Sequence, residues 1–218
     1  MATKAQLQEK IDDLQHQVRR LDRALNQAEI DLKVLPERLV TWPTPHIDPR
    51  SAEALSRGME EWNRVVKEPD NRINTYIRTQ EGIGWGWEKM YKKNGQFAWC
   101  GAFAAYCWSS VKLDIRKKIF PSCYRLYSNW SQTSRHISVD KMSPGDIVIV
   151  YTAKRSKQGD HITICKSAPN SEGIFKTIEG NAFGTLGDDT YGEGVIQRER
   201  NIEEIAHVYR LLGVDFDE

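Results

Sequence analysis

The amino-acid sequence predicts an α+β fold, in which helices come first and an antiparallel sheet of about five strands follows. Helical patterns dominate the first half of the chain. After residue 140 the pattern changes to short β-branched segments separated by Gly, Asn, Asp or Pro. The chain of 218 residues has room for one domain and an appendage, and 39% hydrophobic residues suffice for a core. We place the domain at residues 51–218.

Residues 1–35 are predicted to form a coiled-coil helix, because apolar residues recur at alternating spacings of four and three. A helix that is polar on its other faces cannot bury such a stripe alone. We therefore expect residues 7–35 to form a homo-oligomer or to bind a partner helix, and the alternative is packing against the chain's own domain. The apolar positions are Leu7, Ile11, Leu14, Val18, Leu21, Leu25, Ala28, Leu32 and Leu35.

Residues 36–50 are predicted to form a semi-rigid linker, because four of the chain's eight prolines fall within them. Two helical segments are expected next, at residues 51–69 and 73–82. Ser51 precedes the first of them and is the type of residue that caps a helix N-terminus.

Five strands are predicted from β-branched runs bounded by turn residues. The first follows the turn Ser143-Pro144-Gly145. Their expected ranges are 146–153, 161–168, 174–182, 194–200 and 206–213.

Composition excludes several classes of function. The 31 basic and 30 acidic residues nearly cancel, so no net field favours nucleic acid. No run of about 18 apolar residues exists, so we expect no membrane insertion. The N-terminus lacks the apolar segment of a secretory signal, which predicts synthesis in the cytoplasm without a signal peptide. Four scattered cysteines form neither a disulfide framework nor a zinc-ligand pattern.

The apolar segment FAWCGAFAAYCW, residues 97–108, contains a candidate nucleophile. Cys100 is expected at a helix N-terminus, where unpaired N–H groups and the helix dipole lower the pKa of a thiol. Cys107 would lie two turns further along, a rise of about 10 Å, which excludes a disulfide between the two. Cys107, Cys123 and Cys165 are interpreted as core residues.

A nucleophilic thiol needs a base and a third group that orients the base. Among the five histidines, His161 is favoured because it begins a central strand, and His207 is the alternative. In the next strand, alternation places Thr177, Glu179 and Asn181 on one face. Glu179 and Asn181 are therefore both candidates for the orienting residue.

The ordered motifs Trp99-Cys100, SPGDIVIV, GDHITIC and IEGNA resemble those of CHAP domains, the cysteine, histidine-dependent amidohydrolases/peptidases. The resemblance covers residues 75–212. It implies a papain-like fold with Cys100 as nucleophile, His161 as general base and Glu179 or Asn181 as the orienting residue. It also implies hydrolysis of an amide in peptidoglycan, by an N-acetylmuramoyl-L-alanine amidase or an endopeptidase.

Some members of that family bind calcium through an acidic loop upstream of the cysteine. The corresponding segment here has too few carboxylates for a calcium shell, so no metal is expected, and no cofactor. Gln96 is a candidate donor to the oxyanion. The aromatic residues expected to contact sugar or peptide are Trp85, Trp87, Trp99, Tyr127 and Trp130. The alternative is a core role for at least two of Trp85, Trp87, Tyr127 and Trp130.

A wall hydrolase without a signal peptide needs release or delivery, so a phage lysin and a delivered bacterial toxin both fit. Two other functions remain open. One is a cysteine amidase or peptidase that acts on a substrate outside the cell wall. The other is a catalytically inert oligomeric structural or adaptor protein.

Overall fold

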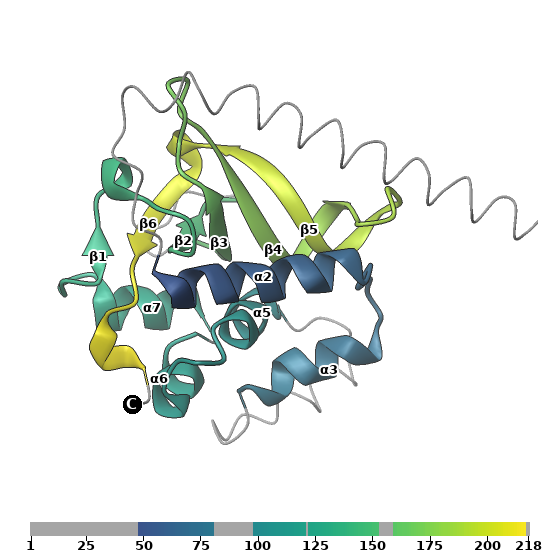
Figure 1. Cartoon of the computed structure of the whole chain (residues 1–218), viewed down its shortest axis with the longest axis horizontal. Coiled ribbons are helices and arrows are strands. Elements are labelled where there is room, and N and C mark those ends of the chain that lie inside the picture. The colour runs from purple at the N-terminus through teal and green to yellow at the C-terminus, as the bar shows by residue number, and fades with distance from the viewer. Residues whose placement is uncertain (1–47, 81–97, 121, 153–158, 217–218) are drawn as a thin grey trace, which may run out of the picture. The chain divides into compact units, whose positions relative to one another are not determined.

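A computed structural model describes residues 48–80, 98–120, 122–152 and 159–216, and shows five helices with a six-stranded antiparallel sheet (Figure 1). The predicted α+β class is confirmed. The chain divides into two units between residues 46 and 47. The predicted helix 1–35 and most of the linker 36–50 lie outside the described residues. Within the described ranges, no helix is long and apolar enough to cross a bilayer.

The first helix begins earlier than the sequence predicts. Helix α2 starts at Pro49, and Asp48 rather than Ser51 is its N-cap, because the Asp48 side chain accepts a hydrogen bond from the Arg50 amide. Proline suits the first helical position, where no backbone donor is needed. The helix ends at Asn63, and Val65 has a left-handed φ of 58°, which a continuing α-helix cannot contain.

Four further helices are described. Helix α3 is shorter than the predicted segment 73–82 and starts earlier, with Asp70 as its N-cap. Helices α6 and α7 are not among the predicted elements. The bounds are α2 (Pro49–Asn63), α3 (Asn71–Arg78), α5 (Cys100–Cys107), α6 (Leu113–Lys118) and α7 (Cys123–Trp130).

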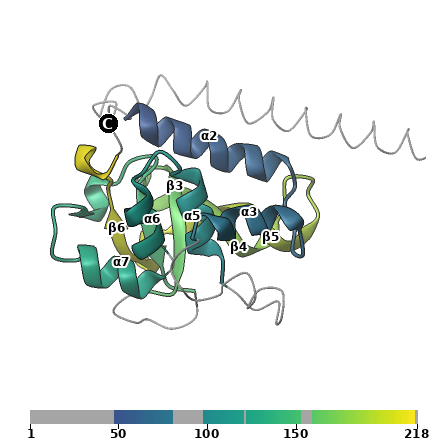
Figure 2. The same cartoon turned by 90° about the horizontal axis from the view of Figure 1, so that it is seen from below.

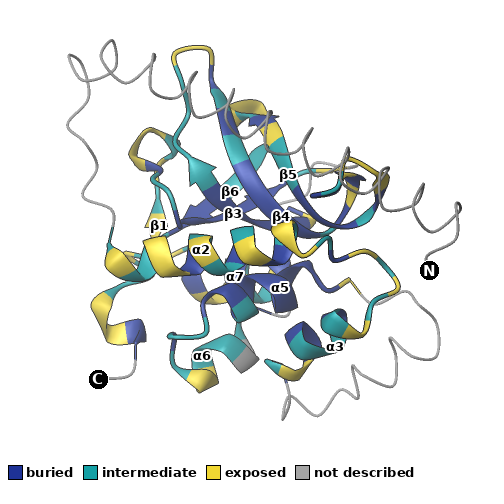
Figure 3. Ribbon diagram, turned by 45° about the vertical axis from the view of Figure 1, so that its right-hand side comes forward, coloured by how far each residue is buried: buried dark blue, intermediate teal, exposed yellow. Residues whose placement is uncertain are grey.

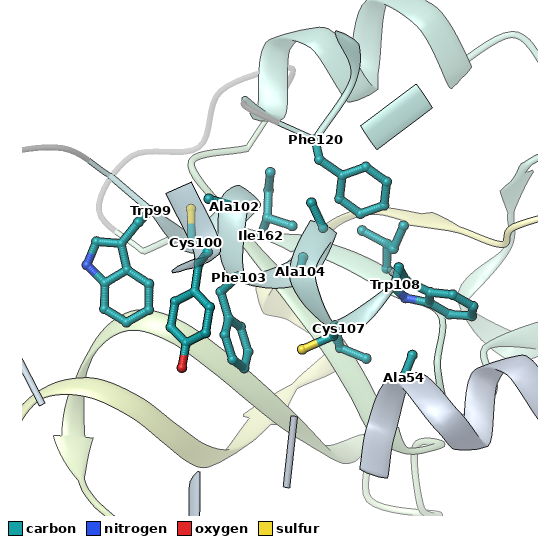
Figure 4. Close-up of a cluster of buried hydrophobic side chains, with 14 of the residues drawn as sticks. Ala54, Trp99, Cys100, Ala102, Phe103, Ala104, Cys107, Trp108, Phe120 and Ile162 are labelled. Atoms are coloured by element: carbon teal, nitrogen blue, oxygen red, sulfur yellow. The ribbon is translucent and has the colours of Figure 1, made fainter. Parts of the chain in front are cut away.

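Helix α5 is the centre of the core. Seven of its eight residues are buried, and Tyr106 is the remaining one. Small residues permit this burial: a Cβ added to Gly101 would come within 1.8 Å of the Phe120 carbonyl oxygen. Figure 4 shows Cys100 and Cys107 at opposite ends of the helix, among the aromatic rings of Trp99, Phe103 and Trp108 and others.

The sheet contains the five predicted strands and one more. Its order is β1-β6-β2-β3-β4-β5, with neighbours antiparallel. The additional strand β1 is two residues long, too short for a recognisable pattern. The bounds are β1 (His136–Ile137), β2 (Ile147–Val150), β3 (His161–Ser167), β4 (Ile174–Thr185), β5 (Tyr191–Asn201) and β6 (Ile205–Tyr209).

Both faces of the central strands are buried, as Figure 3 shows. The helices lie over one face (Figure 2), where Ile147 and Ile149 pack in the main core. Val148 and Val150 point to the other face, into a second apolar cluster. Each such side chain contributes about 1.5–3 kcal/mol on leaving water. This packing fixes the strands that carry the site.

A buried polar cluster ties α2 and α3 to α5. Glu61 is 1% exposed and accepts hydrogen bonds from Arg72 (2.8 and 2.5 Å), Tyr76 (2.5 Å) and Tyr106 (3.2 Å). Burial alone would raise the pKa of Glu61, but these donors and the Arg72 charge lower it overall. The carboxylate therefore stays ionised and links three helices.

Candidate active site

Cys100 and His161 come together although they are far apart in the sequence. Cys100 is the first residue of α5 and His161 the first residue of β3, and both residues are buried, each with 7% exposure. The thiol and the imidazole shift each other's pKa through hydrogen bonding and charge. Helix α5 packs directly on β3 and β4, which holds the two side chains in place.

Several groups stabilise the thiolate form of Cys100. Burial alone would raise the pKa of this thiol. Hydrogen bonding to His161, the imidazolium charge, and the backbone N–H groups of Ile162 and Gly101 act in the opposite direction, and the net pKa is lowered. The start of helix α5 is therefore not alone in lowering the thiol pKa, because a backbone N–H of β3 contributes as well.

Glu179, rather than Asn181, contacts the imidazole. The Nε2 atom of His161 lies 3.1 Å from Oε2 of Glu179. Burial would lower the pKa of His161, but the bonds and charges of Cys100 and Glu179 raise it to about 9. The lowered pKa of the thiol and the raised pKa of the imidazole both favour the thiolate–imidazolium form of the Cys100–His161 pair.

Arg200 on β5 forms a bidentate ion pair with the Glu179 carboxylate. Its Nε donates to Oε1 of Glu179 at 2.6 Å, and a terminal nitrogen donates to Oε2 at 2.8 Å. The Thr177 hydroxyl also donates to Oε1. Burial would raise the pKa of Glu179, yet Arg200 and His161 lower it well below the usual range. Glu179 is therefore a fixed anion, fully buried and saturated with donors.

Asn181 occupies a different position from the one that strand alternation predicts. The pairing of β4 with β5 shifts between Glu179 and Ala182, so that Gly180 and Asn181 form a β-bulge. Asn181 has a φ of 58° and accepts a hydrogen bond from the Trp99 amide at 2.6 Å. The alternation therefore holds for Thr177 and Glu179, and the bulge turns Asn181 toward the start of α5.

Two of the predicted ligand-binding aromatic residues are core residues. Trp99 has no exposed surface, stacks on Tyr76 at 5.7 Å and donates its indole N–H to Glu68 at 3.1 Å. Trp130 is 2% exposed and packs edge-on against Tyr209. Neither ring has a face open to a substrate, and these two assignments are corrected accordingly.

Tyr127 is half-buried, and its ring lies 5.0 Å from that of His207 on β6. His207 in turn lies 3.4 Å from His136 on β1, so the alternative base belongs to a separate cluster at the edge of the sheet. Gln96, Trp85 and Trp87 lie outside the described residues, and their roles stay predictions.

The other three cysteines are buried and free, as Cys100 is. Burial raises the pKa of the Cys107 thiol well above its ordinary value. Burial also raises the pKa values of Cys123 and Cys165. Only Cys100, among the four, is placed where its thiolate is favoured.

Sequence patterns alone did not identify Arg200. Its signal is weak: Arg198 and Arg200 alternate along a predicted strand, and an arginine on a buried strand face requires a carboxylate partner. The neighbouring strand supplies Glu179 as that partner. Arg200 and Glu179 can be recognised as partners only when the pairing of β4 with β5 is known.

Among the described residues, no group of three His, Cys, Asp or Glu side chains is arranged to hold a metal ion. Acidic side chains at the turn between β4 and β5 make local contacts. Asp188 accepts a hydrogen bond from Thr190, and Glu193 on β5 accepts one from Asn181 at 2.6 Å. The chemistry that the described site supports is that of an activated thiol.

Comparisons with protein families, with curated proteins and with solved structures gave no match.

Proposed function

We propose that this protein is a cysteine amidohydrolase with Cys100 as nucleophile, His161 as general acid and base, and Glu179 as the residue that orients His161. The observation that carries the proposal is the buried Cys100–His161–Glu179 arrangement at the N-terminus of α5. A thiolate paired with an imidazolium is the reactive form of such a nucleophile at neutral pH.

The reaction would proceed in two stages. The Cys100 thiolate attacks the amide carbonyl, and backbone N–H groups at the start of α5 stabilise the tetrahedral oxyanion. His161 then donates its proton to the leaving amine, which leaves a thioester on Cys100 and a neutral imidazole. Next, His161 removes a proton from water as the water attacks the thioester, so the acid is released and the thiolate–imidazolium pair is restored.

Peptidoglycan is the proposed substrate, with the bond to L-alanine or a peptide bond of the stem or cross-bridge as the target. The order of the four sequence motifs, which resembles that of CHAP domains, favours it. Assembly through residues 7–35, and release as a phage lysin or delivery as a toxin, belong to the same proposal.

The test is digestion of purified peptidoglycan by the full-length protein, with mass spectrometry of the released fragments. We expect fragments with new amine and carboxyl ends from the wild type and none from Cys100→Ala. Cys107→Ala is the matched control, because it removes a buried thiol from the other end of the same helix. Equal digestion by wild type and Cys100→Ala would refute the mechanism.

A further result separates the alternatives. If wild-type protein releases nothing but Cys100 reacts rapidly with iodoacetamide at pH 7, the substrate is an amide outside the cell wall. If Cys100 reacts no faster than an ordinary buried thiol, the domain is inert.

A further inference from the structure

The bulge in β4 brings Asn181 to the residue that precedes the nucleophile. Gly180 and Asn181 lie opposite the single residue Val195 of β5. A Cβ on Gly180 would come within 2.6 Å of Trp99 and within 2.5 Å of Phe103, so the strand here touches the start of α5 directly. Asn181 tolerates the left-handed backbone better than most residues, which suits it to this position.

Asn181 forms two short hydrogen bonds in opposite directions. Its Oδ1 accepts from the backbone N–H of Trp99 at 2.6 Å, and its Nδ2 donates to Oε1 of Glu193 at 2.6 Å. Because a carboxylate can only accept, Glu193 fixes which end of the amide faces Trp99. The amide oxygen is thereby held toward the helix start.

Trp99 is the N-cap residue of α5, and its own side chain makes no capping bond. Its backbone N–H lies before the helix and is not used by the helical hydrogen bonds, so Asn181 provides a partner that the helix does not. The next peptide group contains the N–H of Cys100. A shift of the Trp99 backbone would therefore move the donor that faces a developing oxyanion.

We infer that Asn181 and Glu193 form a positioning pair that holds the Cys100 backbone N–H in place for oxyanion stabilisation. Neither residue touches the reacting atoms, and both act through Trp99. The inference rests on the proposed function in one respect, namely that Cys100 attacks a carbonyl group. It does not depend on peptidoglycan as the substrate.

Two chemical probes separate this role from the reactivity of the thiol. Acylation by p-nitrophenyl acetate passes through a tetrahedral oxyanion, and it forms a thioester while p-nitrophenolate leaves. Alkylation by iodoacetamide is a direct displacement of iodide at a saturated carbon and forms no oxyanion. Both rates are measured on the full chain, after subtraction of the rate for Cys100→Ala.

Asn181→Gly keeps the left-handed backbone and removes both hydrogen bonds. Loss of an oxyanion donor costs about 100-fold or more, so misplacing one should lower the acylation rate by about tenfold, with alkylation unchanged within about twofold. An unchanged ratio of the two rates would overturn the inference. One such case is an equal loss in both rates, which would indicate a purely structural role for Asn181.

A charge exchange tests Glu193. Asn181→Asp places two carboxylates together and should reduce acylation as Asn181→Gly does. Adding Glu193→Gln restores a donor between the two side chains and should recover the acylation rate. Adding Glu199→Gln instead changes an exposed carboxylate on the same strand and should not. Equal recovery, or no recovery, in the two double variants would overturn the part assigned to Glu193.

If wild-type protein fails to release peptidoglycan fragments, the proposed substrate is wrong, while the ratio of acylation to alkylation still decides the role of the Asn181–Glu193 pair.

Discussion

Replacement of Arg200 by methionine tests whether Glu179 is held as a buried anion. The side chains of Arg200 and Glu179 are 2% and 0% exposed. The substitution therefore leaves a carboxylate that is buried away from solvent and lacks its bidentate partner. Breaking a buried ion pair costs about 3–5 kcal/mol. Because His161 and Thr177 still donate to Glu179, we expect the lower end, about 3 kcal/mol of unfolding free energy.

The pH dependence gives a second measure of the same effect. The pKa of Glu179 lies below its unfolded value of 4.5, so its stabilisation is fully present above that pH and is lost as the pH falls through the folded pKa. We expect the pKa of Glu179 to move back toward 4.5 in Arg200→Met, because Arg200 comes first among the groups that lower it. The stability difference between the two proteins should therefore be largest above about pH 5 and shrink on acidification.

The assay is urea denaturation followed by tryptophan fluorescence at several pH values between 3.5 and 7. Arg57→Met is the matched control, because the Arg57–Glu53 pair is 35% and 47% exposed and such pairs contribute about 0–1 kcal/mol. Loss of less than about 1 kcal/mol for Arg200→Met at pH 7 would refute the reasoning. A stability difference that stays constant down to pH 3.5 would refute it as well.

Four other substitutions or measurements follow from the structure. Iodoacetamide should label Cys100 far faster than Cys107 at pH 7, because only the Cys100 thiol has a lowered pKa. Amide hydrolysis should decline as the pH rises through about 9, where His161 loses the proton that the leaving amine needs. Gly180→Ala should slow acylation and alkylation of Cys100 alike, because the added Cβ would displace the start of α5. Glu61→Gln should lower the unfolding free energy by about 2–3 kcal/mol, measured in urea, and leave alkylation of Cys100 unchanged.

Periodicity predicted those parts of the site that regular secondary structure controls. A cysteine at the start of an apolar helical segment was expected at a helix N-terminus, and α5 begins at Cys100. Alternation in the strand placed Thr177 and Glu179 on one face, and their side chains are hydrogen-bonded. In both cases one local repeat determines the direction of the side chain.

Features that depend on strand pairing were not predictable from the same patterns. The bulge at Gly180 and Asn181 breaks the two-residue repeat, and it lies where the strand comes close to Trp99 and Phe103, which are far away in the sequence. Arg200 is identified only after β4 and β5 are placed in register. Whether an aromatic ring is buried is also a tertiary property, as the full burial of Trp99 shows.

The four charges of the site explain why it can be buried. Cys100, His161, Glu179 and Arg200 alternate in sign, so that each charge lies beside an opposite one. The series of alternating charges ends at Glu204, which accepts a hydrogen bond from Arg200 at 2.7 Å. The Glu204 side chain is 39% exposed and is therefore in contact with solvent. Burial alone would neutralise a thiol and an imidazole; the anion on β4, which the cation on β5 holds ionised, favours the charged form of the pair. The reactivity proposed for Cys100 is thus a property of three adjacent strands as much as of the helix that carries it.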